Sequence, residues 1–254
     1  MTSKEIIKKT PWGNVVFKLE ENIIIRLSGG FDSATLLYTL CDIIEKEPDP
    51  TYYKIIPITV TKVGNKYNDP KKNKANLFLT SDNVIKHAKK RYPLVHIVDS
   101  EKLEIHEWWK DSTLYTKRQQ DLIDKVTKSF KNNNWIEYNG VTKNPDIDIS
   151  PFEKNPELHR QKKLVRGAIK DTVSVHFPFC NAIEPFRNAD KRIVFSLAKQ
   201  HNVLDELLEI SRSCEGGSGA TNNFTIDCKD GPYSDEYVCW WCVEREWALK
   251  NYDI

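Results

Sequence analysis

Two groups of residues in this 254-residue chain have types and spacings that could do chemistry. The first, Ser28-Gly29-Gly30-Phe31-Asp32-Ser33, follows the apolar run Ile23–Leu27 and opens an amphipathic segment. Glycines let a backbone approach a ligand, and a turn that begins a helix directs N–H groups and the positive helix end to one point. The pattern predicts a phosphate-binding turn between a buried strand and a helix. An ordinary strand–turn–helix connection with a Ser or Asp cap is the alternative interpretation. No Gly-Lys-Ser/Thr follows, so the turn is not a Walker A loop.

Four cysteines near the end of the sequence form the second group: Cys214, Cys228, Cys239 and Cys242. Cys239-Trp-Trp-Cys242 is a CxxC pair, and four thiolates around Zn²⁺ make a closed structural site. Metal binding would supply folding free energy to the stretch 213–234, where Gly, Ser, Asn and Asp dominate. A redox pair at Cys239 and Cys242, or free thiols in a packed tail, are the alternatives. Cys41 and Cys180 stand in apolar surroundings and are predicted core residues.

The elements that must position these residues alternate between strands and helices. Apolar runs predict strands over 22–27, 54–60, 94–98 and 135–142, with Pro57 weakening the second strand. Helical spacing of apolar residues predicts helices over 32–47, 81–91, 115–131, 189–201 and 203–210. This alternation implies an α/β fold with a doubly wound, mainly parallel sheet and the glycine turn after its first strand. Ligands bind at the carboxyl ends of such strands, so Ser28 and Gly140 should face one pocket.

Composition limits the function classes. Hydrophobic content of 39% and charged content of 29% suit a globular protein, and no apolar run approaches the length of a membrane span. The first residues lack the apolar core of a signal peptide, so a cytoplasmic protein without a membrane partner is expected. A net charge of +2 does not favour a nucleic-acid partner. We predict an α/β domain over 1–185 and a helical part with the four-cysteine metal site over 186–254.

The Ser-Gly-Gly-x-Asp-Ser pattern resembles the PP-loop of the ATP pyrophosphatases, which cleave ATP between its α- and β-phosphates. Three segments together resemble the 7-cyano-7-deazaguanine synthases of the preQ0 pathway. They are the PP-loop with its helix, the stretch from Pro185 to Gly216 that contains Ser211-Arg-Ser-Cys214, and Cys239-Trp-Trp-Cys242 followed by Arg245. The chain departs from that family in three places: Cys228 stands apart from the last two cysteines, Asn188 replaces an expected lysine, and no Tyr-Gly-Gln-Arg-His-like segment follows Val60.

The resemblance implies an ATP-dependent, AMP-forming ligase with ATP, Mg²⁺ and Zn²⁺ as cofactors. Such an enzyme adenylates a 7-deazaguanine carboxylate, uses ammonia to form an amide, and forms a nitrile after a second adenylation. The nucleotide would bind Ser28, Gly29, Gly30, Phe31, Asp32, Ser33 and Gly140, with Asp32 either placing Mg²⁺ or capping the helix. Positive charge is also needed at the transferred group, and Arg118 and Lys191 are candidates by position. The zinc ligands would be Cys214, Cys228, Cys239 and Cys242.

Two other classes of function remain open at this stage. One is a different PP-loop enzyme, such as a sulfonucleotide reductase or a tRNA-thiolating enzyme. A reductase would need a catalytic cysteine, and a tRNA enzyme would need a broader basic surface. The other is a non-catalytic nucleotide-binding module that has kept the loop. The expected partners are a small deazapurine carboxylate and ammonia, and a homodimer is compatible with the sequence.

Overall fold

The computed structural model of this chain describes residues 4–63, 77–106, 110–111, 113–130, 134–152, 155–163, 173–178, 181–212 and 239–253. Its strands are β1 (Lys4–Thr10), β2 (Gly13–Leu19), β3 (Asn22–Arg26), β4 (Lys54–Val63), β5 (His96–Ile97), β6 (Glu101–His106), β7 (Trp135–Tyr138), β8 (Val175–Phe177) and β9 (Ala182–Glu184). Its α-helices are α1 (Phe31–Glu45), α2 (Leu77–Arg91), α3 (Leu114–Thr127), α4 (Pro156–Lys163), α5 (Arg192–Gln200), α6 (Leu204–Ile210) and α7 (Trp240–Asn251). Short 3₁₀ turns lie at Pro50–Tyr52 and Ser150–Phe152.

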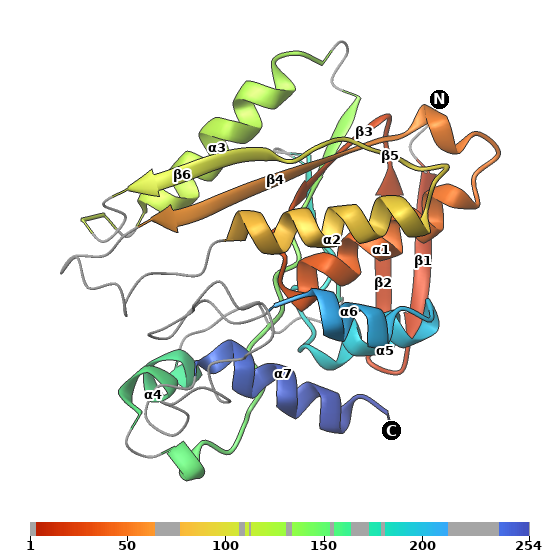
Figure 1. Ribbon diagram of the computed structural model, residues 1–254. Helices are drawn as coiled ribbons and strands as arrows, with labels where there is room; N and C mark the ends of the chain where they lie inside the picture. The colour runs from red at the N-terminus through yellow and green to blue at the C-terminus, as the bar shows by residue number, and fades with distance from the viewer. Residues whose placement is uncertain are drawn as a thin grey trace.

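A seven-stranded sheet organises the molecule, in the order β5-β4-β3-β7-β9-β8, with β6 also pairing with β4 (Figure 1). All pairs in this sheet are parallel except β8 with β9. The chain runs outward from β3 through β4 to β5 and β6, and then returns to β7 on the other side of β3. The predicted mainly parallel, doubly wound sheet is confirmed, and its topological switch point lies between β3 and β7.

Strand β3 reads as a continuous apolar run because helices cover both faces of the sheet. Ile23 and Ile25 belong to the main core, which contains α1 and α2, whereas Ile24 packs in a second core with Leu122 and Ile123 of α3. Figure 1 shows α1 and α2 on the opposite side of the sheet from α3. Burial on both faces therefore explains why the sequence signal of this strand is strong.

The sequence predicted that Pro57 weakens the hydrogen bonding of its strand. In the structure, the pairing of β4 with its outer neighbours is interrupted beside this residue. In β4, Lys54 N–H and the Ile58 carbonyl bond toward β3, while the Ile55 carbonyl bonds toward Val98. This alternation directs residue 57 toward the edge formed by β5 and β6, where proline has no N–H to donate. Strand β5 ends opposite Ile55 and β6 begins opposite Ile58, so the edge is interrupted beside Pro57.

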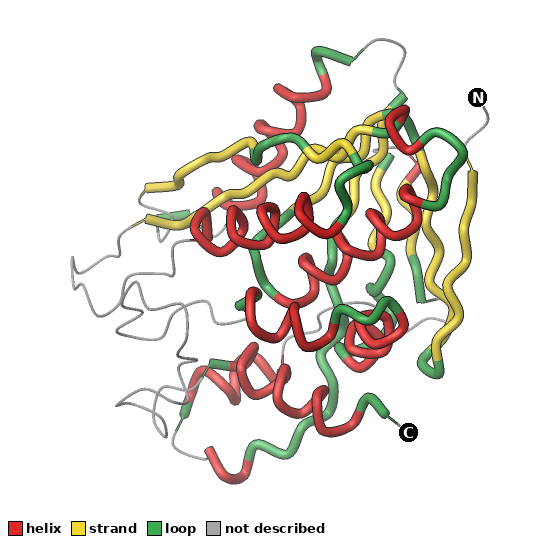
Figure 2. Tube along the Cα trace, turned by 45° about the vertical axis from the view of Figure 1, so that its right-hand side comes forward, coloured by secondary structure: helices red, strands yellow, loops and turns green. Residues whose placement is uncertain are grey.

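The sequence did not predict the strands β1, β2, β6, β8 and β9 or the helix α4. The antiparallel hairpin β1–β2 precedes the sheet, although no strand was expected before residue 22, so the glycine turn follows the third strand of the chain. Helices α5 and α6, which were predicted over 189–201 and 203–210, share the main core with α1. Figure 2 shows the helices in red and the strands in yellow. The division at 185/186 stays a prediction. Within the described residues, no helix is long and apolar enough to cross a membrane.

Candidate functional site

The Ser-Gly-Gly-x-Asp-Ser segment forms the predicted turn between β3 and α1. The Ser28 hydroxyl accepts a hydrogen bond from Gly30 N–H at 3.2 Å, and the Ser33 hydroxyl donates to the Gly30 carbonyl at 3.1 Å. The two hydroxyl oxygens lie 3.2 Å apart. Helix α1 begins at Phe31, and no side-chain hydrogen bond caps it. The amides of its first turn have no intrahelical partners and are available to an anion.

Gly29 is required by the backbone of this turn. Its φ is +77°, in the left-handed region that favours glycine. A Cβ at this position would lie 2.6 Å from the backbone of Thr80 and Ser81, at the start of α2. The turn is therefore pressed against α2, and a larger residue would displace either the turn or the helix.

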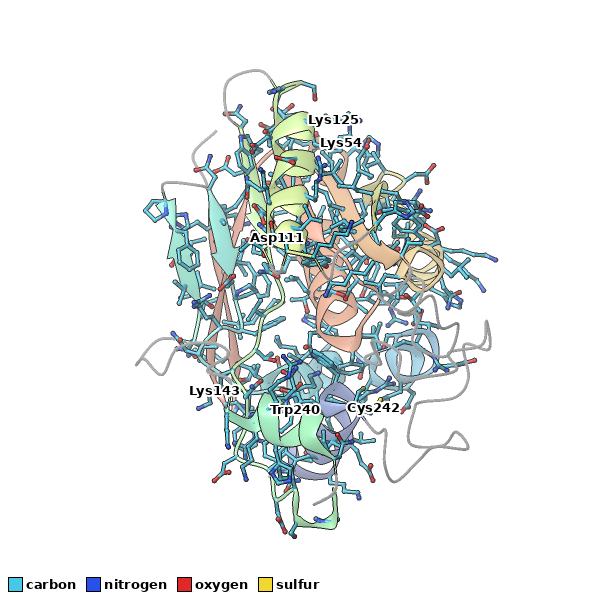
Figure 3. All side chains as sticks on the ribbon, turned by 90° about the vertical axis from the view of Figure 1, so that its left-hand side faces the viewer. Lys54, Asp111, Lys125, Lys143, Trp240 and Cys242 are labelled. Carbon is cyan, nitrogen blue, oxygen red and sulfur yellow. The ribbon has the colours of Figure 1, made fainter. Side chains whose placement is uncertain are left out.

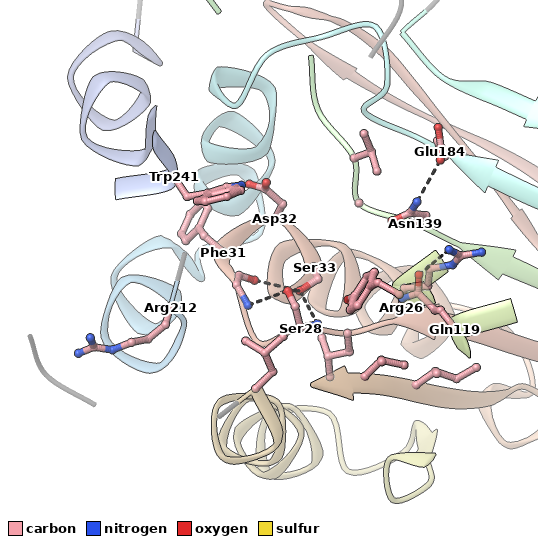
Figure 4. Close-up of a pocket in the computed structure, with 18 of the residues that line it drawn as sticks. Arg26, Ser28, Phe31, Asp32, Ser33, Gln119, Asn139, Glu184, Arg212 and Trp241 are labelled. Carbon is pink, nitrogen blue, oxygen red and sulfur yellow. Dashed lines mark hydrogen bonds between the residues drawn. The ribbon is translucent and has the colours of Figure 1, made fainter. Parts of the chain in front are cut away.

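A cavity of about 540 Å³ opens above the turn, at the carboxyl ends of β3, β4 and β7. Ser28 and Gly140 both line it, which confirms the prediction that these two strand ends face one pocket. One wall is apolar and aromatic, with Leu27, Ile58, Val60, Leu77 and Tyr115. The opposite wall contains Asn139, Val141, Glu184, Lys191 and Trp241. Figure 4 shows Trp241 reaching from α7 toward the same region as Phe31 and Asp32.

A buried ionic cluster lies at the helix end of the cavity. Lys191 Nζ is 3.3 Å from Asp32 Oδ2 and 3.0 Å from Glu244 Oε2. The side chains of Lys191 and Glu244 are 1% and 0% exposed, and that of Asp32 is 17% exposed. The structure thus brings two predicted site residues, Asp32 and Lys191, together at the turn. Glu244 joins them from α7, which no sequence pattern had connected with the loop.

Arg118 occupies a different place from Lys191. Its side chain is 56% exposed and pairs with Asp121 at 3.5 Å, one turn along α3. The residues of α3 that line the cavity are Tyr115, Thr116 and Gln119. The structure does not bring Arg118 to the cavity, because the helix directs this position toward solvent. Arg26, at the end of β3, lines the cavity but is paired with Glu137, and it donates to Gln119 at 2.7 Å.

Several cavity residues were missed by sequence reasoning. Arg212 and Trp241 lie in segments that were considered only for their cysteines, and Arg212 N–H donates to the Gly29 carbonyl at 2.8 Å. Asn139 directly follows β7 and Glu184 ends β9, and the Asn139 amide donates to Glu184 at 3.0 Å. The position of Asn139, next to Gly140 at a predicted strand end, is the one signal that was available.

Mg²⁺ fits one feature of the site. Asp32 Oδ1 is buried and has no hydrogen-bond partner among the described residues. A carboxylate oxygen is the ligand that Mg²⁺ prefers, and this ion usually takes its remaining ligands from phosphates and water. Asp32 is therefore the residue of this turn whose chemistry fits such an ion.

The cysteine prediction is only partly within the described residues. Cys239 and Cys242 are buried at the start of α7, with their sulfurs 3.4 Å apart, in a small core with Trp240 beside α4 (Figure 3). Two ligands of one tetrahedral zinc ion lie about 3.8 Å apart, so this pair suits half of such a site.

Cys214 and Cys228 lie outside the described residues, as does Cys180. Among the described residues no group of three metal-binding side chains occurs. Cys41 is a buried core residue, as predicted, and burial raises its thiol pKa.

Comparisons with known proteins do not assign a function to this chain. No protein-family model matches the sequence, and no curated protein matches it either. Among solved structures, the chain is similar to an NMN synthetase from Francisella tularensis, with 14% sequence identity. The match covers 91% of this chain and 85% of that one, with a TM-score of 0.41. At this similarity, function has to be argued from the site itself.

Proposed function

We propose that this protein is an ATP-dependent, AMP-forming ligase of the PP-loop type. The observation that carries the proposal is the Ser28–Ser33 turn at the switch point of the sheet, with the buried ammonium of Lys191 beside it. A helix N-terminus, two serine hydroxyls and a lysine converge on one end of a cavity large enough for a nucleotide. This arrangement suits a polyphosphate with its Mg²⁺ better than an uncharged ligand. The helix end, the hydroxyls and the ammonium stabilise negative charge, and the Asp32 carboxylate beside Lys191 would bind the ion.

The cavity gives each part of the nucleotide a place. The β- and γ-phosphates would bind the amides at Phe31–Ser33, and the adenosine would lie along the apolar wall of Leu27, Ile58 and Val60. The α-phosphate would then face Lys191 and the opposite wall, where the acceptor enters. The chemistry needs mainly orientation and charge neutralisation, which preformed amides and a fixed ammonium supply. Bound Mg²⁺ would neutralise further charge on the leaving pyrophosphate.

The acceptor that we propose is a carboxylate, and specifically 7-carboxy-7-deazaguanine. Its carboxylate oxygen attacks the α-phosphorus and pyrophosphate leaves, which gives an acyl adenylate. Ammonia displaces AMP to give the amide. Adenylation of the amide oxygen by a second ATP and elimination of AMP give the nitrile. The choice of acceptor rests on the sequence resemblance, whereas the use of ATP rests on the geometry of the turn.

We also propose that one zinc ion joins Cys239 and Cys242 to Cys214 and Cys228. The short distance between the first two sulfurs supports this hypothesis. In such a site the zinc is structural, because four thiolates leave no open position for a substrate.

One experiment tests the function. The protein is incubated with ATP, Mg²⁺, ammonium and 7-carboxy-7-deazaguanine, and the products are identified by mass spectrometry. We expect AMP, pyrophosphate and the nitrile. If AMP and pyrophosphate form with another acceptor but not with this one, the protein is still a ligase, and its substrate differs from the one proposed. Nucleotide binding without any release of AMP or pyrophosphate, across carboxylate and sulfur acceptors, would favour a non-catalytic nucleotide-binding module.

A further inference from the structure

We infer that Glu244 is a positioning residue, which holds the ammonium of Lys191 at the place where it meets the nucleotide. This inference rests on the proposed use of ATP at the same cavity. Glu244 is a fully buried carboxylate from α7, and Lys191 precedes α5. Together with the contact between Lys191 and Asp32, the contact between Glu244 and Lys191 connects the last helix of the described chain to the turn after β3.

The distances place Lys191 between two competing carboxylates. Its Nζ lies 3.0 Å from Glu244 and 3.3 Å from Asp32, and its side chain is 1% exposed. At this low exposure, water screens the charge of Lys191 only weakly. Without the charge of Glu244, we expect the ammonium to shift toward Asp32. It would then neutralise the carboxylate that should face the metal and the phosphates.

Glu244 has the rigidity that a positioning role requires. Its neighbour Arg245 donates to the carbonyls of Leu208 at 2.8 Å and Ser211 at 3.2 Å, which fixes α7 to the end of α6. Arg212, the next residue, is bound to the turn through the Gly29 carbonyl. The backbone of α7 at Glu244 and the glycine turn are therefore both attached to the segment at the end of α6. The Lys191 ammonium lies between the Glu244 and Asp32 carboxylates.

The first test observes Lys191 directly and needs no turnover. In the full chain, ¹⁵N spectra of the lysine ammonium groups should show a slowly exchanging Lys191 signal, assigned by its loss in Lys191→Arg. Glu244→Gln should shift this signal or broaden it beyond detection. Glu246→Gln is the matched control, because Glu246 lies on the same helix in an exposed pair with Lys250. An unchanged Lys191 signal in Glu244→Gln would overturn the inference.

The second test measures catalysis. Glu244→Gln should lower kcat at least about tenfold while KM for ATP changes less than about threefold, because the lost interaction acts mainly on the transferred group. Glu244→Asp keeps the charge on a shorter side chain and should retain more of kcat than Glu244→Gln. If Glu244→Gln does not fold, Glu244→Asp is used in its place in both tests. Equal kcat for Glu244→Gln and wild type, or a change in KM alone, would refute the positioning role. Absence of wild-type turnover would count against the proposed function only, since the spectra decide on Glu244 independently.

Discussion

The backbone N–H of Arg212 donates to the carbonyl of Gly29 at 2.8 Å, so the segment after α6 is bound directly to the glycine turn. On its other side the turn contacts α2, where the Thr80 hydroxyl donates to the Ser28 carbonyl at 3.3 Å. The turn is thus held from two directions by elements distant in sequence. Its backbone amides are fixed before any ligand arrives, which lowers the entropic cost of binding.

Gly29→Ala should disrupt this arrangement. The added Cβ would lie 2.6 Å from the backbone of Thr80 and Ser81, and φ is +77°. We expect a loss of about 2–3 kcal/mol in the free energy of unfolding, since strain and overpacking act together. Denaturant unfolding measures it. Gly140→Ala is the control for stability, because its Cβ would make ordinary contacts at 3.4 Å. Similar unfolding curves for the two variants would contradict the explanation given for Gly29.

Ser28→Ala and Asp32→Ala should each lower pyrophosphate release at least about tenfold while the protein stays folded. In the proposed site each substitution removes a group that would act on charged phosphates or their metal, and such hydrogen bonds contribute about 1.5–3 kcal/mol. Pyrophosphate release is followed with a coupled assay, and circular dichroism reports folding. Ser129→Ala, at the far end of α3, serves as the control. Wild-type turnover in the double variant would exclude the turn as the phosphate site.

Arg245→Ala should destabilise the protein by about 2 kcal/mol, because a buried guanidinium that donates to two carbonyls is removed. Arg245→Lys should recover only part of this loss, since an ammonium cannot reproduce the planar fork. Thermal and urea unfolding provide the measurement. Lys250→Ala on the exposed side of α7 should change stability by less than about 0.5 kcal/mol. If both substitutions cost the same, Arg245 does not anchor α7 in the way described.

Asp42→Asn should give a pH-dependent loss of stability. Burial raises the pKa of the Asp42 carboxyl, but the His201 imidazole at 3.0 Å and the Lys46 ammonium outweigh it, so the pKa lies well below its usual range. Over the acid range the unfolded state then binds more protons than the folded state. The contribution of Asp42 is fully present above its ordinary pKa of about 3.9 and is lost as the pH falls through the lower folded pKa.

We therefore expect Asp42→Asn to cost about 1–2 kcal/mol at pH 7, and the difference from wild type to shrink as the pH falls below about 4. Urea unfolding at a series of pH values gives the curve. Asp99→Asn, in an exposed pair with Lys89, should differ from wild type much less, because solvent screens that pair. If the stability difference between Asp42→Asn and wild type grew on acidification, the inferred direction of the Asp42 pKa shift would be wrong.

Elemental analysis should find about one zinc ion per chain. Cys242→Ser should remove the metal and lower the melting temperature, because a tetrahedral site loses a ligand. Cys41→Ser should leave the zinc content unchanged, since Cys41 lies in the main core. If Cys228→Ser retains zinc, the metal site is still supported, but Cys228 is not one of its ligands. A zinc-free wild type would end the hypothesis and favour a redox role for the Cys239–Cys242 pair.

The sequence predicted the parts of the site that depend on local patterns. An apolar run and a glycine turn specify the connection from β3 to α1, and helical spacing specifies α3, α5 and α6. The hairpin β1–β2 was missed because lysines and isoleucines mix along β1 without strict alternation. Trp241 and Glu244 were missed for another reason. Their places at the cavity depend on how α7 packs against α5 and α6, which no local pattern in the sequence encodes.

The pairing of β3 with β7 has a kinetic consequence. It joins Asn22 to Trp135 and Ile25 to Tyr138, so the whole intervening chain must collapse before the two strands meet. Closing so long a segment makes folding slow compared with the formation of local helices and hairpins. Because the cavity lies across this pair and takes Lys191 from further along the chain, nucleotide binding should appear late in refolding, after most of the helical signal has returned.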